Sequence, residues 1–496
     1  MSNHNFIDSS HQSEENYDEY LYLLSSKSSL PHTQRGLQGH THSSSNELIS
    51  REQTPQANII SRDPPSASPE TNGTMATDTL EQPLANGTSS APHTNGGSTT
   101  TAPGLSADEI ALYDRQIRLW GAKAQESIRS ANVLLVSLRA LGTEIAKNLT
   151  LAGISSLTII DDEPVMEEDL GAQYFIRDSD IGTPRAEAAI PRIQELNPRV
   201  KVQSGGSLTQ LLTEDQNYYK PYSIIIACDH DLLTLSTINT TARFASVPFY
   251  AAGIHGMYGY IFADLLTHEF VVEREKSNIS TTIGTESLTR SVISVTSQRG
   301  NDGKTKEIVR KREQYCPLIL ANSSPLPSGI LASQRKLKAV PALLPCLRAL
   351  FDFQRTTGHF PSQTNQDLAA FTTLATAKSR ELQLPLETLK ADFLHSFIKN
   401  LGAEIVPTAA FVGGRLAEDV INVLGQREQP IQNFAMFDGE GLEGRIYSLW
   451  SAPPEVVMAG QSVNGLVVGG GGGLVGSGNG VSAVENGSAA EAIVLD

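Results

Sequence analysis

Short apolar runs alternate with amphipathic stretches between residues 130 and 255. Runs of this length bounded by turn residues are typical of buried strands, and apolar positions spaced three to four apart are typical of helices. Strands that alternate with helices favour a mostly parallel sheet flanked by helices, an α/β fold of Rossmann type. The strands are predicted at 133–136, 157–160, 200–203, 224–228 and 249–252, and the helices between them at 143–152, 185–195 and 232–246.

Two helices are predicted before the first strand. Ser106 followed by Glu109 is the signature of a capping box, in which each side chain bonds the backbone N–H of the other residue. A helix is therefore expected to begin there, and a second one over 122–130 leads into the first strand.

After Gly253 the pattern changes to a period of two, which predicts antiparallel strands at 258–264 and 268–272 appended to the sheet. A polar insert over 276–301 is expected to be mobile. Three helical patterns inside 331–401 predict a helical insertion, and a buried helix and a late strand then complete the sheet. These last elements are expected at 341–354, 365–381, 387–401, 408–424 and 434–438.

The folded part is predicted to be one domain over 104–452. Residues 1–103 are rich in Ser, Thr, Asn, His and Gly, so they bury too little apolar surface to offset ordering entropy and are expected to form a disordered tail. Residues 453–496 read as a flexible glycine-rich tail. The sequence shows neither a signal region nor an apolar run of about 18 residues, so a secreted or membrane protein is not expected.

The net charge of −16 argues against general nucleic-acid binding, because phosphate affinity needs concentrated Lys and Arg. One basic run, 304–312, is either a nuclear import signal or a solvated surface loop. The three cysteines are spaced too widely for a zinc site or a disulfide framework, which favours a reducing compartment and predicts no metal site.

The segment 137–142 lies between the first strand and the helix that follows it. An acidic pair, Asp161-Asp162, ends the next apolar run, and this layout is typical of a nucleotide-binding βαβ unit. A working turn needs glycines where φ is positive and where N–H groups touch a phosphate. Only Gly142 remains of that pattern, so the turn is predicted to have lost its ligand. Side chains enter the phosphate space at Ser137, Arg139 and Ala140.

Several separated blocks resemble the adenylation domains of enzymes that activate ubiquitin-like modifiers. The resemblance covers roughly residues 105–450 and is nearest to the SUMO-activating branch. Such enzymes are built from two related halves, of which one holds ATP and a catalytic cysteine and the other supports it. The blocks are 113–121, 142–149, 171–175, 268–270, 411–414 and 437–439.

The resemblance places this chain in the supporting half. Gly171 and Ala172 stand where an active half carries an Asn and an Arg that grip ATP phosphates, and Arg185 replaces an expected lysine. Retained acids without phosphate donors cannot hold a tetra-anion. ATP and Mg²⁺ are therefore expected in the partner subunit and not in this chain alone. The vestigial acids are Asp161 and Glu163 for the ribose and polar contacts, and Asp229 for the metal.

None of the cysteines is expected to form the thioester, which needs an exposed and thiolate-prone side chain. Cys228 ends a buried strand, Cys346 lies in an apolar helix pattern, and Cys316 sits between Tyr315 and Pro317.

Arg115 is the residue to which the resemblance assigns a catalytic role. In the family's supporting half the arginine after the Tyr-Asp pair reaches into the partner's ATP site, as an arginine finger given in trans. The alternative is a surface salt bridge with Asp114 or Glu109. For Arg139 two hypotheses stay open: it fills the emptied phosphate cavity, or it pairs with Asp161.

The resemblance implies a supporting subunit that pairs with a catalytic SUMO-activating subunit. The pair would adenylate a SUMO-type modifier, load it on the partner's cysteine and pass it to a conjugating enzyme, in the nucleus and also in the cytoplasm. The alternatives are the supporting subunit for a Rub-type modifier, a nucleotide-dependent oxidoreductase that uses the turn directly, and an adaptor without a role in catalysis.

Overall fold

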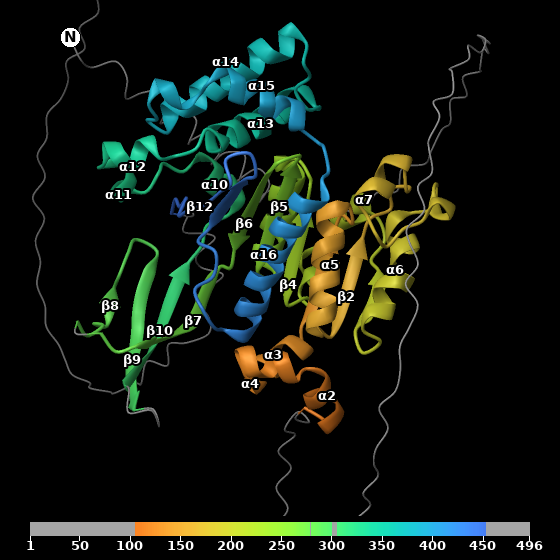
Figure 1. Cartoon of the computed structure of the whole chain (residues 1–496), viewed down its shortest axis with the longest axis vertical. Coiled ribbons are helices and arrows are strands. Elements are labelled where there is room, and N and C mark those ends of the chain that lie inside the picture. Colours follow the sequence, from red (N-terminus) through yellow and green to blue (C-terminus); the bar gives the residue numbers. More distant parts are fainter. Residues whose placement is uncertain (1–104, 278, 300–304, 453–496) are drawn as a thin grey trace, which may run out of the picture. The chain divides into compact units, whose positions relative to one another are not determined.

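The computed structural model describes residues 105–277, 279–299 and 305–452 (Figure 1). The tails expected over 1–103 and 453–496 lie outside the described residues. Among the described residues, no helix is both long enough and apolar enough to cross a membrane.

An eight-stranded sheet forms the centre of the described fold, in the order β12-β11-β6-β5-β4-β1-β2-β3. The five strands from β3 to β5 pair in parallel, and β6, β11 and β12 extend the sheet in antiparallel pairs. The predicted α/β class with a mostly parallel sheet is confirmed. The strands are β1 Asn132–Val136, β2 Ser156–Ile160, β3 Lys201–Ser204, β4 Ile224–Cys228, β5 Phe249–His255, β6 Tyr258–Asp264, β11 Phe434–Asp438 and β12 Glu443–Tyr447.

Two apolar cores cover the two faces of this sheet. Alternate residues of β1 enter different cores: Val133 and Leu135 face one, and Leu134 and Val136 the other. The period of two along the strand thus produces both layers. One face is covered by α5 Ala140–Ala152, α6 Arg185–Leu196 and α16 Val406–Gly425, and the other by α9 Leu232–Phe244, α10 Leu318–Ser323 and α13 Leu343–Thr357.

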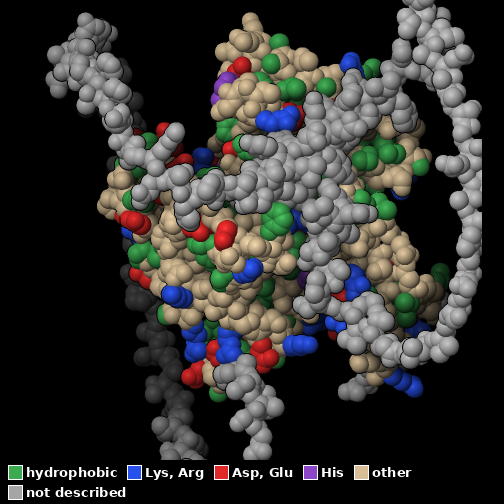
Figure 2. Space-filling model, turned by 180° about the vertical axis from the view of Figure 1, so that it is seen from behind, with side chains coloured by type: hydrophobic (Ala, Val, Ile, Leu, Met, Phe, Trp, Pro, Cys, Tyr) green, Lys and Arg blue, Asp and Glu red, His purple; other side chains and the backbone are tan. Residues whose placement is uncertain are grey.

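Three short helices precede the sheet and lie at its lower end in Figure 1: α2 Ala107–Leu112, α3 Asp114–Trp120 and α4 Ala122–Arg129. The predicted capping box is present, with Ser106 and Glu109 bonding each other's backbone N–H. Gln116 of α3 donates to the carbonyl of Leu151 at 3.1 Å, which anchors α3 beside the last turn of α5. Acidic and basic side chains lie next to one another at this lower end in the view from behind (Figure 2).

A second, four-stranded antiparallel sheet follows β6, in the order β7-β10-β9-β8. The sequence pattern placed β7 in the main sheet, which is wrong, and it did not reveal the regular structure within 276–301, which carries β8 and β9. β8 pairs with β9, and β9 pairs with β10, so the segment belongs to a sheet. The strands are β7 Thr267–Glu275, β8 Gly284–Thr285, β9 Arg290–Arg299 and β10 Thr305–Gln314.

The basic run lies in β10, apart from Lys304, which is outside the described residues. β10 pairs with β7 on one side and with β9 on the other. Arg312 contacts Glu269 at 2.6 Å and Lys311 contacts Glu286 at 2.7 Å. The run is therefore neither a surface loop nor an extended segment open to a receptor.

The helical insertion forms a layer above the sheet in Figure 1. Its three main helices agree with the predicted ones to within a few residues, and α11 and α12 precede them. The chain then returns through α16 to β11. The helices are α11 Ser328–Leu331, α12 Gln334–Lys338, α13, α14 Asn365–Glu381 and α15 Ala391–Asn400, while α7 Leu208–Thr213 and α8 Gln216–Tyr219 connect β3 to β4.

Candidate functional site

The predicted turn lies where β1 and β4 leave the sheet side by side. In doubly wound sheets this switch point, at the carboxyl ends of the strands, is where nucleotides bind. Ser137 has a φ of 75°, a left-handed conformation that glycine adopts more easily. A Cβ on Gly142 would meet the carbonyl oxygen of Ser137 at 2.2 Å, so that glycine is required by packing. The turn has therefore kept the backbone path of a nucleotide turn.

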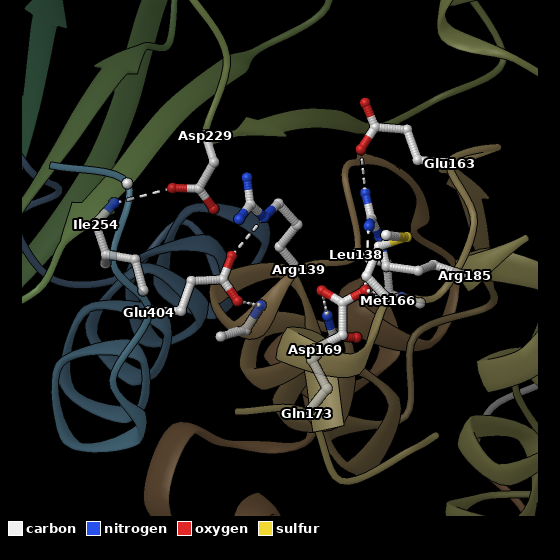
Figure 3. A network of polar contacts seen from close by, with 12 residues as sticks. Leu138, Arg139, Glu163, Met166, Asp169, Gln173, Arg185, Asp229, Ile254 and Glu404 are labelled. Carbon is white, nitrogen blue, oxygen red and sulfur yellow. Dashed lines mark hydrogen bonds and ion pairs between the residues drawn. The ribbon is translucent and has the colours of Figure 1, made fainter. Parts of the chain in front are cut away.

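A carboxylate from far along the chain occupies the mouth of this turn. Glu404 lies between α15 and α16, and its Oε2 accepts the backbone N–H of Ala140 at 3.1 Å. Its Oε1 forms an ion pair with Nε of Arg139 at 2.5 Å, and only 12% of the Glu404 side chain is exposed (Figure 3). The hypothesis that Arg139 pairs with Asp161 is wrong, because Arg139 pairs with Glu404.

Asp161 is engaged by the protein itself. Its Oδ2 accepts the N–H of Leu138 at 2.7 Å and Nε of Arg185 at 3.0 Å, and its Oδ1 accepts the N–H of Glu163 at 3.3 Å. Asp161 and Arg185 are both buried. The carboxylate that the resemblance assigns to the ribose is thus already satisfied.

Arg185 joins three carboxylates at the start of α6. Besides Asp161 it contacts Asp169 at 3.3 Å and the exposed Glu163 at 2.5 Å (Figure 3). Burial opposes its charge, but the neighbouring carboxylates raise the pKa of Arg185 above its usual value. This cation is held among acids and is not free to hold a phosphate.

Asp229, after β4, faces Arg139 and Glu404 across a cavity of about 50 Å³. Its Oδ1 accepts the N–H of Ile254 at 2.9 Å, while its Oδ2 is shielded from solvent and has no hydrogen-bond partner among the described residues. Burial raises the pKa of Asp229 to about 7; the bond from Ile254 opposes this, Glu404 adds to it, and Arg139 opposes it.

Two histidines line the same cavity. Burial and the nearby charge of Arg139 lower the pKa of His255 to about 4. Burial also lowers the pKa of His230, although neighbouring acids, with Asp231 the strongest, oppose the change. Both rings are therefore neutral near pH 7, and His255 accepts the N–H of Gly402 through Nδ1 at 3.4 Å.

These residues do not fit a nucleotide. A triphosphate at the turn would meet the carboxylate of Glu404, and a ribose would find Asp161 already bonded to Arg185. Like charges at close range in a partly desolvated site repel strongly. Among the described residues, no group of three or more His, Cys, Asp or Glu could hold a metal ion.

All three cysteines are fully buried. Burial raises the pKa of the Cys228 thiol well above its ordinary value, that of Cys316 to about 12, and that of Cys346 further still. A thiol that stays protonated and shielded cannot attack an acyl adenylate. These three side chains pack in the core.

Arg115 is exposed on α3, far from the turn. Asp114 pairs with Arg118 at 3.0 Å and Glu109 pairs with Arg129 at 2.9 Å. Within the described residues neither acid forms an ion pair with Arg115. The structure thus brings together the vestigial residues after β1, β2 and β4, and it places Arg115 at the other end of α5.

The family model described as "ThiF family" matches residues 113–454, a span that holds the whole sheet and both sides of the blocked turn. The chain belongs to the ThiF family.

Three relatives agree with this chain over most of their own length. DNA damage tolerance protein RHC31 of Saccharomyces cerevisiae is 39% identical over 346 residues, which cover 68% of this chain and 96% of the relative. SUMO-activating enzyme subunit 1 of Homo sapiens is 33% identical over 347 residues, 68% of this chain and 94% of the relative. DNA damage tolerance protein rad31 of Schizosaccharomyces pombe is 32% identical over 349 residues, 70% of this chain and 98% of the relative.

These similarities confirm the resemblance to the supporting half of a SUMO-activating enzyme and do not favour a Rub-type enzyme. An oxidoreductase would need the open glycine turn that this ThiF chain has closed. Sequence reasoning noticed Arg139 and Arg185 but missed Glu404 and Asp169. Glu404 is 264 residues from its partner Ala140, so no local pattern could have linked the two.

Proposed function

We propose that this chain supports a catalytic SUMO-activating subunit in a heterodimer. The pair adenylates the C-terminal glycine of a SUMO-type modifier with ATP and Mg²⁺ held by the partner, and loads the modifier as a thioester on the partner's cysteine. A conjugating enzyme then receives the modifier. The blocked turn supports this division, because the part of the chain that the structure describes offers neither an open phosphate site at the turn nor an exposed thiol.

The position of Arg115 is the observation that carries the proposal. Gln116, beside it on α3, bonds Leu151 near the end of α5, whereas the blocked turn lies at the start of α5. The rise of a helix places these ends roughly 17 Å apart. Arg115 therefore cannot serve the turn of its own chain, and it is free to serve another.

A related subunit packed by an approximate two-fold axis against α5 would reverse the direction of that helix. The partner's turn, at the start of its own α5-like helix, would then lie near this chain's α3. Pairing of related chains about two-fold axes is the commonest assembly mode. Arg115 would thus reach the site where the partner holds ATP.

Adenylation at the partner's ATP site would be helped by a cation supplied by the other subunit. Attack of the glycyl carboxylate on the α-phosphorus releases pyrophosphate and concentrates negative charge on the departing group. A guanidinium remains charged and can bond phosphate oxygens at two points. Arg115 supplies this charge without making its own subunit an ATP-binding protein.

The proposed location is the nucleus, with some enzyme in the cytoplasm. The DNA damage tolerance named for the two yeast relatives supports this. The signal for entry is not assigned to the basic run, since β10 is paired on both edges.

The test is modifier-dependent exchange of pyrophosphate into ATP. We expect no exchange by the chain alone and exchange by the pair with a SUMO-type catalytic subunit. A loss of about 1,000-fold or more is expected when the pair carries Arg115→Ala, since arginine fingers contribute about 10³–10⁵. Arg118→Ala is the matched control, because Arg118 lies on the same exposed helix and pairs with Asp114.

Exchange by the chain alone would contradict the blocked turn. If the pair is active and Arg115→Ala does not change its exchange rate, this chain is an adaptor that stabilises its partner and has no role in catalysis. Binding of the two subunits should be measured in parallel by calorimetry, so that lost pairing is not mistaken for lost chemistry.

A further inference from the structure

The segment between α15 and α16 is fastened over the vestigial turn. Gly256 donates its N–H to the carbonyl of Ala403 at 2.7 Å, and Met257 donates to Oδ1 of Asn400 at 3.2 Å. The contact of Gly402 with His255 adds a third attachment. This segment therefore has a defined position, from which Glu404 extends into the turn (Figure 3).

The carboxylate of Glu404 meets the groups that a phosphate would use. The first turn of α5 carries partial positive charge, because its N–H groups are unpaired within the helix. Glu404 accepts one of these N–H groups, from Ala140, and neutralises the guanidinium of Arg139. The anion that binds at the turn is thus the carboxylate of Glu404, a residue of the same chain.

We propose that Glu404 is an internal substitute for the nucleotide phosphate and keeps the turn closed to polyanions. The turn has thus lost its ligand in two ways: its glycines are replaced, and the carboxylate of Glu404 has taken the place of the phosphate. The remaining donors, the start of α5 and Arg139, are sufficient to hold a small inorganic anion once the carboxylate is removed. Removal of the carboxylate does not create a nucleoside site, since Asp161 remains bonded to Arg185.

A tethered carboxylate competes well with free anions. Its effective concentration at the turn is set by the fastened segment, and such intramolecular concentrations reach the millimolar range or above. Free phosphates must also place their charge beside Asp229. Cellular pyrophosphate therefore cannot displace Glu404, and the nucleotide of the assembled enzyme is bound at one site only.

The test uses the full chain without a partner and inorganic pyrophosphate as the probe, with ionic strength matched by KCl. We expect Glu404→Ala to show a rise in Tm that saturates with pyrophosphate and a calorimetric Kd at least about 10-fold tighter than that of the wild type. Glu387→Ala removes an equal charge from an exposed position of the helical insertion and should behave as the wild type.

Glu404→Gln keeps an oxygen for the N–H of Ala140 and removes the charge, so it tests the proposal if Glu404→Ala fails to fold. Adding Arg139→Ala to either variant should abolish the gained affinity. Equal binding of pyrophosphate by wild type and variant would overturn the proposal. So would a folded variant that binds none.

Discussion

At the residue scale, the vestigial site has kept its charged side chains, and its arginines now pair with carboxylates of the same chain. Arg185 serves three carboxylates and Arg139 serves Glu404, so two cations that could face a ligand face the protein. Asp229 differs from the other carboxylates of the site, because its shielded Oδ2 has no hydrogen-bond partner among the described residues. The folded protein therefore disfavours the ionised form of Asp229.

Replacing Asp229 by asparagine should reveal this as a dependence of stability on pH. An aspartate in an unfolded chain ionises near pH 4, whereas Asp229 in the folded protein has a pKa of about 7. Between these values the folded state binds the extra proton, so the wild type loses stability as pH rises, with a slope approaching about 1.4 kcal/mol per pH unit. Asp229→Asn lacks this loss.

The measurement is urea unfolding of both proteins from pH 4 to pH 8. Arg139, Glu404, His230 and His255 face Asp229 and are unchanged in both proteins, so the difference in free energy of unfolding reports on the aspartate. A difference that stays level across this range would show that Asp229 ionises normally.

The sequence revealed the loss of donors at the turn but not what replaced them. The exchange of glycine for Arg139 is visible in one line of sequence, because turn geometry depends on local residue types. The identity of its partner depends on how the chain returns after α15. Two glutamates such as Glu404 and Glu387 look alike in the sequence, and only the fold brings one of them to the turn.

At the element scale, patterns predicted the long elements that bury a face, but they missed the short buried helix α10 and the strands β9 and β10. The helices of the insertion and the strands of the main sheet have strong apolar signals, since each contributes to a core. Most residues of β9 and β10 are half-buried or exposed, and these strands are held by backbone pairing and by ion pairs such as Arg312–Glu269. A strand of that kind reads as a polar insert.

Two adjacent glycines of α16 differ in how closely they approach α5, and this difference can be tested. A Cβ on Gly413 would lie 2.8 Å from Cβ of Glu144 on α5, whereas a Cβ on Gly414 would meet nothing within 4 Å. Gly413→Ala should force the helices apart and cost about 1–3 kcal/mol. Gly414→Ala should be neutral or stabilise by up to about 1 kcal/mol, because alanine favours a helix over glycine.

Chemical unfolding of the two variants checks this directly. Each serves as the control for the other, since both add one methyl group to the same helix. Equal effects would mean that the helices do not touch at Gly413.

At the scale of the whole molecule, the side of α3, α5 and α16 leaves apolar groups in water. Leu151 and Phe411 are exposed there, and a hollow of about 470 Å³ lies among the three helices. Exposed apolar side chains beside a hollow favour this side as the place where a partner binds. It is also the side on which the proposed two-fold axis would place the partner.

Leu119, 77% exposed at the end of α3, should report on that pairing. We expect Leu119→Glu to leave the unfolding of the isolated chain unchanged within about 0.5 kcal/mol, as for other surface substitutions. It should weaken binding of the catalytic subunit by about 10-fold or more, since a buried carboxylate would lack a partner.

The matched substitution is Leu386→Glu, which changes a leucine that is 81% exposed on the helical insertion. Calorimetric titration of both variants with the catalytic subunit separates the two surfaces. If Leu386→Glu weakens binding and Leu119→Glu does not, the partner covers the insertion and not the face of α3.

The order of strands in the main sheet also bears on how the protein is made. β6 receives its outer neighbour only when Phe434 pairs with Phe262, about 170 residues later in the chain. At the usual pace of synthesis, about 5–20 residues per second, this delay lasts roughly 10–30 s. During that interval the nascent chain presents an open strand edge and an unfinished core, which are the surfaces most prone to aggregation before a fold is complete.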